Sequence, residues 1–304
     1  MAKIAINNLT SVDYAYIAPD GQIRGDSFNV NVILSGEPTN DEHVVVDFGT
    51  AKKEIKALID HPQTGFDHKL WVDPRWVTYG EVEGTVCVKT PFVNLVVPTD
   101  ALNICDVGLL PEYLISGYLN SKLPYTVEVT ASTEPTVMRN YETDMYDWSE
   151  PVFFNYVHGL KDSSSWGCQN LAHGHLSFLQ ILWDERMNPF EVARVTKYLA
   201  ESSQNAIFIK KENVVENTCV PELKTFSTKV EYSSNDRGVF KGTFSVRSDL
   251  IGQSRVCILD TETTIEYLVE EFARTLQSIC KEDMRFIKAI FVSEGLNKGA
   301  IYEF

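Results

Sequence analysis

The chain has 304 residues, enough for one large domain or two ordinary ones, and its 44% hydrophobic and 23% charged residues are typical of a globular protein. The net charge of −15 argues against a nucleic-acid-binding surface, which needs clustered Lys and Arg. This charge also gives no long-range attraction for a polyanion. A phosphate pocket would therefore be local, with Lys52-Lys53 and Lys210-Lys211 as candidate donors unless they are simply exposed lysines.

No stretch approaches the ~18 uninterrupted apolar residues of a transmembrane helix, and the first residues lack the apolar region and cleavage site of a secretory signal. The six cysteines are scattered singly, without a Cys-x-x-Cys pair. Such cysteines are expected to be reduced thiols, most of them buried as small hydrophobic residues. The sequence thus predicts a cytoplasmic protein that binds no membrane.

The first part of the chain, residues 1–140, predicts strands and helices in a definite order. Alternation of apolar and polar residues predicts a strand over Asn29–Leu34. A buried strand over Val44–Phe48 then enters a helix with one apolar face. A helix over Leu109–Leu123 leads into an alternating strand over Tyr125–Ala131.

The second part, residues 141–304, repeats this order. Its expected elements are strands over Val152–His158 and Leu176–Trp183, a helix over Pro189–Glu201, a helix opening with a capping box at Thr263 and Glu266, and a last strand over Phe286–Val292. Each part then consists of strand, strand, helix, helix and strand. We therefore expect an α+β protein made by tandem duplication, with units 1–140 and 141–304 and a boundary within Thr133–Glu150.

Three histidines form a candidate metal site in the second part. His173 and His175 lie two residues apart on an expected strand, so both side chains point to one face. His158, on another expected strand, is a candidate for the third imidazole. Three histidines leave an open fourth position on tetrahedral zinc, as a catalytic site requires.

A thiol and a carboxylate–imidazole pair are the other candidates for chemistry. Cys168 lies close to the histidines in sequence, and a neighbouring cation would populate its reactive thiolate. Alternatively, Cys168 is a fourth zinc ligand that closes a purely structural site. In the first part, Asp67 beside His68 suits a carboxylate that holds an imidazole for proton transfer, although such a dipeptide is common by chance.

Several segments together resemble the family of 6-pyruvoyl-tetrahydropterin synthase and 6-carboxytetrahydropterin synthase. They are Val46-Asp47-Phe48, Phe66-Asp67-His68-Lys69-Leu70, Phe154 to Leu160, Cys168 to His175, Thr263 to Glu266, and Ser293-Glu294 with Ala300-Ile301-Tyr302. The segments occur in the order of the family once a duplication is allowed. The resemblance implies tunnelling-fold units, each an antiparallel β-sheet with two helices on one face, assembled into an oligomeric barrel.

The resemblance also implies roles for single residues. It implies zinc bound by His158, His173 and His175. It implies a catalytic Cys168 that works with an Asp-His pair, and this pair comes from a neighbouring subunit in the family. Glu294 would anchor the pterin, with Thr264 as a further substrate-binding residue.

The two parts of the chain depart from the family pattern in complementary ways. The first part has Val12 to Tyr16 and Gly25 to Phe28 where the family has its histidines, so it has lost the zinc ligands but keeps Asp67-His68. The second part keeps the histidines and the cysteine but has Ser202 to Glu212 in place of the Asp-His pair. One chain should therefore replace two subunits of a homo-oligomer.

The resemblance implies a zinc-dependent lyase that acts on 7,8-dihydroneopterin triphosphate. We favour the 6-carboxy-5,6,7,8-tetrahydropterin synthase reaction of the 7-deazaguanine (queuosine-type) route, which releases acetaldehyde and triphosphate. The alternatives are a 6-pyruvoyl-tetrahydropterin synthase, which releases triphosphate alone, a non-catalytic pterin-binding homologue, and a structural zinc protein. The sequence leaves open whether Asp67 and His68 meet Cys168 of the same chain or of a neighbour.

Overall fold

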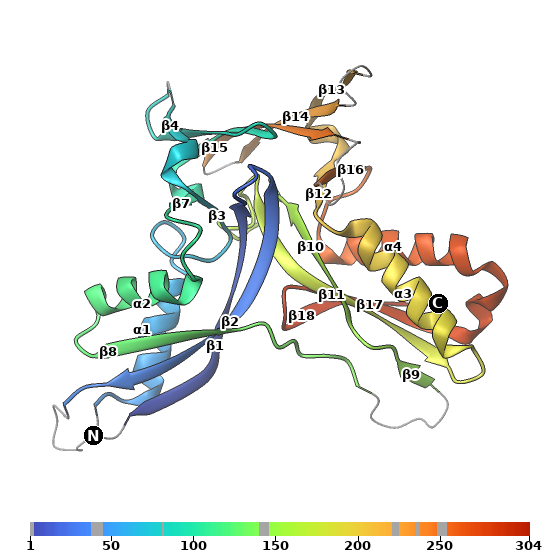
Figure 1. Ribbon diagram of the computed structural model, residues 1–304, viewed down its shortest axis with the longest axis horizontal. Helices are drawn as coiled ribbons and strands as arrows, with labels where there is room; N and C mark the ends of the chain where they lie inside the picture. Colours follow the sequence, from blue (N-terminus) through green and yellow to red (C-terminus); the bar gives the residue numbers. More distant parts are fainter. Residues whose placement is uncertain are drawn as a thin grey trace.

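The computed structural model describes residues 3–37, 45–80, 82–139, 146–220, 225–234, 237–247 and 254–304. These residues form three β-sheets and four α-helices (Figure 1). Short 3₁₀ helices add single turns at Pro74–Trp76, Thr99–Ala101, Lys211–Asn213 and Lys281–Phe286. Within the described ranges, no helix has the length and apolar character needed to cross a membrane.

The first sheet belongs to the N-terminal half and has the strand order β7-β3-β1-β2-β8. Its strands are β1 (Ile4–Ile17), β2 (Ile23–Ser35), β3 (Lys69–Val72), β7 (Leu102–Ile104) and β8 (Thr126–Ser132). Helices α1 (Phe48–Ile59) and α2 (Pro111–Lys122) cover one face of this sheet. Their buried residues, such as Ile55 and Leu119, share one apolar core with alternate residues of β1, β2 and β8.

The second sheet belongs to the C-terminal half and has the order β16-β12-β10-β11-β17-β18, with β9 paired to β11. Its strands are β9 (Tyr146–Trp148), β10 (Val152–His158), β11 (His173–Asp184), β12 (Ala206–Lys210), β16 (Arg255–Leu259), β17 (Ile287–Glu294) and β18 (Lys298–Glu303). Helices α3 (Pro189–Ser203) and α4 (Ile265–Cys280) share a second core with one face of this sheet.

The third sheet joins the two halves. Its order is β13-β14-β15-β6-β5-β4, and the antiparallel pair of β15 with β6 connects them. Its strands are β4 (Val77–Tyr79), β5 (Thr85–Lys89), β6 (Val93–Pro98), β13 (Val214–Val220), β14 (Thr225–Ser234) and β15 (Gly238–Arg247). Residues of both halves, including Leu70 and Val157, pack against it in a third core, so the halves share this core besides the separate core that each has with its helices.

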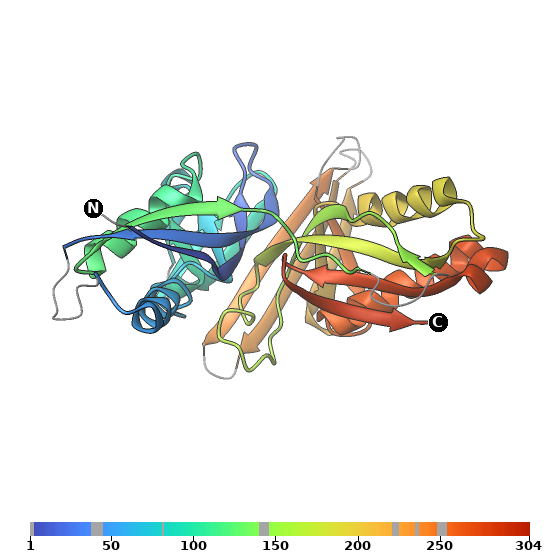
Figure 2. The same cartoon turned by 90° about the horizontal axis from the view of Figure 1, so that it is seen from below.

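The two halves repeat one arrangement of elements. The order β7-β3-β1-β2-β8 of the first sheet matches the order β16-β12-β10-β11-β17 of the second. In each half one helix follows the first hairpin, three strands of the joining sheet come later, and a second helix precedes the next strand. Figure 2 shows the halves side by side. The unit boundary stays a prediction, since residues 140–145 lie outside the described ranges.

The predicted α+β class is confirmed, with two corrections to the expected sheets. The sheets are mixed rather than wholly antiparallel, because β3 runs parallel to β1 and β12 runs parallel to β10. The strand expected over residues 44–48 is wrong in its described part, where residues 45–47 form no strand. Asp47 is instead the N-cap of α1, and its side chain accepts a hydrogen bond from the Thr50 N–H at 2.8 Å.

The capping box expected at Thr263 and Glu266 is also wrong. Helix α4 begins at Ile265 with Thr264 as its N-cap, and Thr264 makes no side-chain capping bond. The carbonyl and hydroxyl of Thr263 instead lie beside His158. Thr263 therefore contacts His158 and does not cap the helix.

Candidate active site

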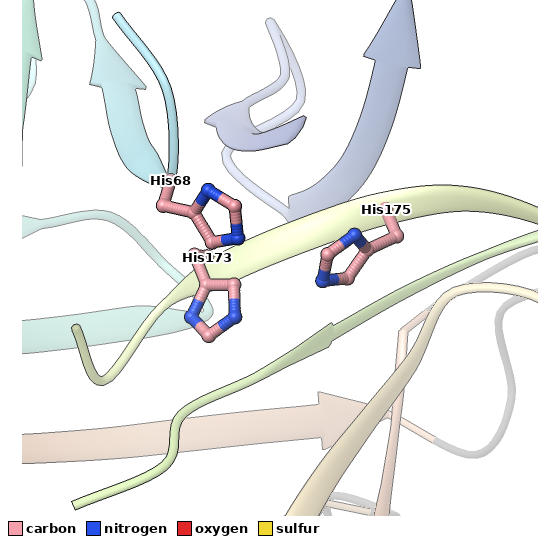
Figure 3. A group of neighbouring side chains, drawn as sticks. All are labelled: His68, His173 and His175. Carbon is pink, nitrogen blue, oxygen red and sulfur yellow. The ribbon is translucent and has the colours of Figure 1, made fainter. Parts of the chain in front are cut away.

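The pairing of β10 with β11 brings the three predicted histidines together. His158 lies opposite His173, and His175 follows two residues later on the same face of β11. All three side chains are buried. The ring centroids of His158 and His173 are 4.3 Å apart, and the Nε2 atoms of His158 and His175 are 3.1 Å apart. Figure 3 shows His173 and His175 on one strand, with His68 reaching them from another segment.

Hydrogen bonds leave the outer ring nitrogens of these histidines available as ligands. The Nδ1 of His158 lies 2.7 Å from the Thr263 carbonyl oxygen, and the Nδ1 of His173 lies 3.3 Å from the Asn170 carbonyl oxygen. A carbonyl only accepts, so each Nδ1 carries a proton and each neutral ring has a lone pair on Nε2. The Nε2 of His173 is buried without a hydrogen-bond partner among the described residues, as expected of a metal ligand.

The protonation of the rings separates ligands from proton carriers. Burial, together with the neighbouring His175, lowers the pKa of His158 to about 3, and burial holds the pKa of His173 well below its usual value. Both rings are therefore neutral, as metal binding requires. Burial would lower the pKa of His68 too, but Asp67 outweighs it and holds this pKa well above the usual value. His68 is thus an imidazolium, which is a poor ligand.

Potential ligand atoms cluster in two overlapping groups at this centre. Within each group the atoms lie within 4.8 Å of one another: His68, His173 and His175 in one, and His158, His175 and Glu294 in the other. The three predicted ligands are divided between these groups. In the part of the chain that the structure describes, none of the groups includes Cys168, which argues against Cys168 as a fourth zinc ligand.

The Asp67–His68 pair meets Cys168 within one chain. The Asp67 carboxylate lies 2.6 Å from the His68 Nδ1, and the His68 ring lies close enough to the Cys168 thiol to act on its ionisation. Although burial opposes it, this contact lowers the pKa of Cys168. The structure therefore brings together the two segments that the sequence separates, without a second chain.

The backbone of the cysteine loop is fitted to His68. A Cβ on Gly167 would come within 2.5 Å of the His68 Cβ, so only glycine allows this approach. The Asn170 amide donates to the His68 carbonyl oxygen at 2.5 Å. Arg237, which directly precedes β15, donates hydrogen bonds to the Asn170 side chain and to the Asp100 carboxylate. Its guanidinium also stacks over the Trp166 ring. These contacts fix the loop that carries the thiol.

Asp13 is a site residue that the sequence analysis missed. It lies on β1 in the first half, buried, with its carboxylate oxygen 3.4 Å from the His175 Nδ1. Its backbone N–H donates to Asp67 at 2.9 Å, and its carbonyl accepts from the His68 N–H at 2.6 Å. The signal in the sequence is a carboxylate within the apolar and aromatic run Val12 to Tyr16.

A pocket of about 240 Å³ opens beside this centre and is lined by both halves. Its lining is Thr10, Ser11, Asp13, Lys56, Asp60, Asp67, His68, Glu294, Leu296, Asn297 and Lys298. A neighbouring pocket of about 280 Å³ shares Lys56 and adds Lys52 and Lys53. Lys210 and Lys211, the other candidate phosphate donors, instead form ion pairs with acidic side chains.

The two predicted substrate-binding residues have different surroundings. Glu294 lines the pocket of about 240 Å³, and its carboxylate lies 3.1 Å from the Lys298 ammonium. It also lies within reach of His158 and His175, so it is placed to bind either substrate or metal. Thr264 is half-buried at the start of α4, and its role stays a prediction.

Comparison with known proteins gives a limited result. No family model matches the chain, and no curated protein matches it. Similar solved structures include 6-pyruvoyl tetrahydropterin synthase from Plasmodium vivax, with 11% identity and a TM-score of 0.35. The enzyme of the same name from Plasmodium falciparum has 12% identity and a TM-score of 0.32. Each match covers 53% of this chain and 99% of the other.

About half of this chain thus matches nearly the whole of each synthase. At such low identities and TM-scores, the matches establish neither activity nor substrate. The functional conclusion must therefore rest on the site itself.

Proposed function

We propose that this protein is a zinc-dependent lyase of the 6-carboxytetrahydropterin synthase type, acting on 7,8-dihydroneopterin triphosphate. One observation carries the proposal. The Cys168 thiol, activated by the Asp67–His68 pair, lies beside buried neutral imidazoles whose outer nitrogens are free to bind a metal. A metal centre next to an activated thiol and a charged imidazole suits proton removal next to a carbonyl.

The donor set fits zinc. His158, His173 and His175 supply imidazole nitrogens, a preferred ligand type of zinc, and leave room for a substrate atom. Zinc bound there would act as a Lewis acid on a hydroxyl or carbonyl oxygen of the substrate side chain.

The chain's own residues move the protons. Cys168 Sγ, as the thiolate that the neighbouring His68 favours, accepts a proton from a carbon of the substrate side chain. His68 is held through its Nδ1 by Asp67, so it can return a proton to the thiolate or to substrate without turning away. General acid–base catalysis of this kind contributes about 10²–10⁴ in rate.

The charges of the pockets suit a substrate with a polar ring and an anionic tail. The Glu294 carboxylate, in the pocket beside the metal centre, can accept hydrogen bonds from the amino and ring N–H groups of a pterin. Lys52, Lys53 and Lys56 line the adjoining pocket and can pair with a triphosphate. Glu294 as the pterin anchor and Thr264 as a further substrate-binding residue belong to this proposal.

Assembly into a homo-oligomer is also part of the proposal. Among the described strands, β8 ends the first sheet and β18 ends the second, each with one unpaired edge. Such edges can pair with those of a second chain. A ring of duplicated chains would then need half as many chains as a ring of single-unit subunits.

Product analysis tests the function directly. The zinc-loaded protein is incubated with 7,8-dihydroneopterin triphosphate, and pterin, acetaldehyde and triphosphate are measured. We expect 6-carboxytetrahydropterin with acetaldehyde and triphosphate, and loss of turnover with zinc retained in Cys168→Ala. Cys219→Ala, which alters an exposed cysteine on β13, is the matched control and should keep full turnover.

The outcomes separate the alternatives. Triphosphate release without acetaldehyde identifies a 6-pyruvoyl-tetrahydropterin synthase. Zinc and pterin binding without turnover identifies a non-catalytic homologue. Full turnover in Cys168→Ala contradicts the proposed mechanism.

A further inference from the structure

Asp13 connects the first half of the chain to the metal centre of the second. Its carboxylate is buried against His175 and accepts a hydrogen bond from the Ser27 hydroxyl. The same Ser27 oxygen accepts from the Leu176 N–H at 3.0 Å, directly after His175 in the chain. An added Cβ on Gly295 would come within 2.4 Å of the Asp13 carboxylate, so glycine there leaves room for it. The carboxylate is therefore fixed in place from several sides.

The contacts of His158 restrict how His175 can be protonated. The His158 Nδ1 donates to a carbonyl, so its Nε2 presents a lone pair to the His175 Nε2 at 3.1 Å. A neutral His175 has one proton to place. On Nε2, that proton would leave a bare Nδ1 facing the Asp13 carboxylate, which is repulsive. On Nδ1, it faces the carboxylate, and the Nε2 lone pairs of His158 and His175 then point toward the same place, where a bound metal ion can accept both.

We infer that Asp13 is a positioning residue for the metal centre. Its carboxylate holds the His175 ring with the Nδ1 proton toward Asp13 and the Nε2 lone pair toward His158. This inference rests on the proposed function, since it takes these histidines as metal ligands. It deepens that function because it gives the first half a part in metal binding. The first half does so even though it has other residues at the positions equivalent to the zinc ligands.

The backbone of the same residue holds the proton-transfer pair. The Asp13 N–H binds the Asp67 carboxylate, and the Asp13 carbonyl binds the His68 N–H. One residue thus sets the position of a metal ligand through its side chain and that of the catalytic pair through its main chain. Substitution of the side chain removes only the first contact, which allows the two roles to be separated.

Zinc affinity, measured by competition with a chelator, tests the side-chain role. Partners that orient metal-ligating histidines typically contribute ~10–100-fold to metal affinity. We therefore expect Asp13→Ala to bind zinc ~10–100-fold more weakly and Asp13→Asn, whose amide oxygen can still accept, to lose less. Asp26→Asn is the matched control, because Asp26 is a nearby carboxylate that bonds Tyr14 and the Ser27 N–H instead. Equal affinity of Asp13→Ala and wild type overturns the inference, as does an equal loss in Asp26→Asn.

A second measurement needs no change at Asp13. Nitrogen NMR of the zinc-loaded protein with ¹⁵N-labelled histidine, assigned by the signal missing in His175→Gln, reports which ring nitrogen of His175 is protonated. We expect a protonated Nδ1, and a protonated Nε2 with a bare Nδ1 overturns the inference. Failure to bind zinc at all would instead contradict the proposed function, so the two failures are distinguishable.

Discussion

The two halves of the chain hold different side chains at equivalent positions of one framework. In the first hairpin Tyr16 lies opposite Arg24, and in the second His158 lies opposite His173. Two residues further along, Asp26 takes the place of His175. The first half therefore offers a phenol, a guanidinium and a carboxylate where the second offers three imidazoles, and only the second has neutral nitrogen ligands.

The catalytic pair shows the reverse difference. Tyr14 lies beside Lys69 on β3 and Tyr156 lies beside Ala206 on β12, so Asp67-His68 corresponds to Gln204-Asn205. His68 and Asn205 share a left-handed backbone, with φ of 55° and 57°. The same backbone thus carries a carboxylate–imidazole pair in one half and two amide side chains in the other. Each half has kept the residues that the other lacks. The hairpins β1–β2 and β10–β11 cross closely where Gly25 meets Gly174, and this crossing joins the retained residues into one site.

The largest expected difference concerns metal binding. His173→Ala should reduce bound zinc to near zero, because it removes a ligand, whereas Arg24→Ala at the equivalent position should leave the zinc content unchanged. Metal analysis after dialysis measures both. Retained zinc in His173→Ala, or lost zinc in Arg24→Ala, would show that the two halves are not divided in this way.

The next difference concerns turnover. His68→Asn places in the first half the residue that the second half has at this position, and Asn tolerates the left-handed backbone. The fold should survive while turnover falls by about 10²–10⁴, the usual contribution of general acid–base catalysis. The reciprocal Asn205→His should leave turnover unchanged. Steady-state kinetics measures the turnover of both variants. An equal change in turnover in the two variants would refute the assignment.

The smallest expected effect concerns the crossing of the hairpins. Gly25 and Gly174 are equivalent in the two halves, and a Cβ on Gly25 would come within 2.0 Å of the Tyr156 carbonyl oxygen. Gly25→Ala and Gly174→Ala should therefore each lower the free energy of unfolding by about 1–3 kcal/mol or more. Gly117→Ala on α2, where nothing lies within 4 Å of the added atom, is the control and should be neutral or stabilising. Denaturant unfolding distinguishes these outcomes, and a silent Gly25→Ala would argue against the close crossing.

Much of the framework could be predicted from local periodicity. The strand Val152–His158 is found with the predicted bounds, and helices α2 and α3 lie within about a turn of theirs. The joining sheet was missed even though β14 alternates in the way a strand requires, with Thr228, Val230 and Tyr232 buried. Strand 44–48 was wrong because an apolar run before a helix does not by itself distinguish a strand from a loop.

The candidate site was predictable only where its residues form short motifs. His173 and His175 are adjacent on one strand face, and Asp67 touches His68 directly. Asp13 and Arg237 act on residues far away in the sequence, and nothing local marks a contact between Asp13 and His175. Such long-range contacts arise where the two halves pack across each other. Neither the composition nor the spacing of residues predicts that packing.

Mixing two inactive variants tests most directly the claim that one chain holds a complete site. Cys168→Ala chains and His68→Asn chains are unfolded together, refolded as a mixture and assayed with 7,8-dihydroneopterin triphosphate. Because Asp67, His68 and Cys168 meet within one chain, each assembled site should carry one defect, and the mixture should be no more active than the separate variants. Recovered activity would mean that the halves are shared between chains and would contradict this account.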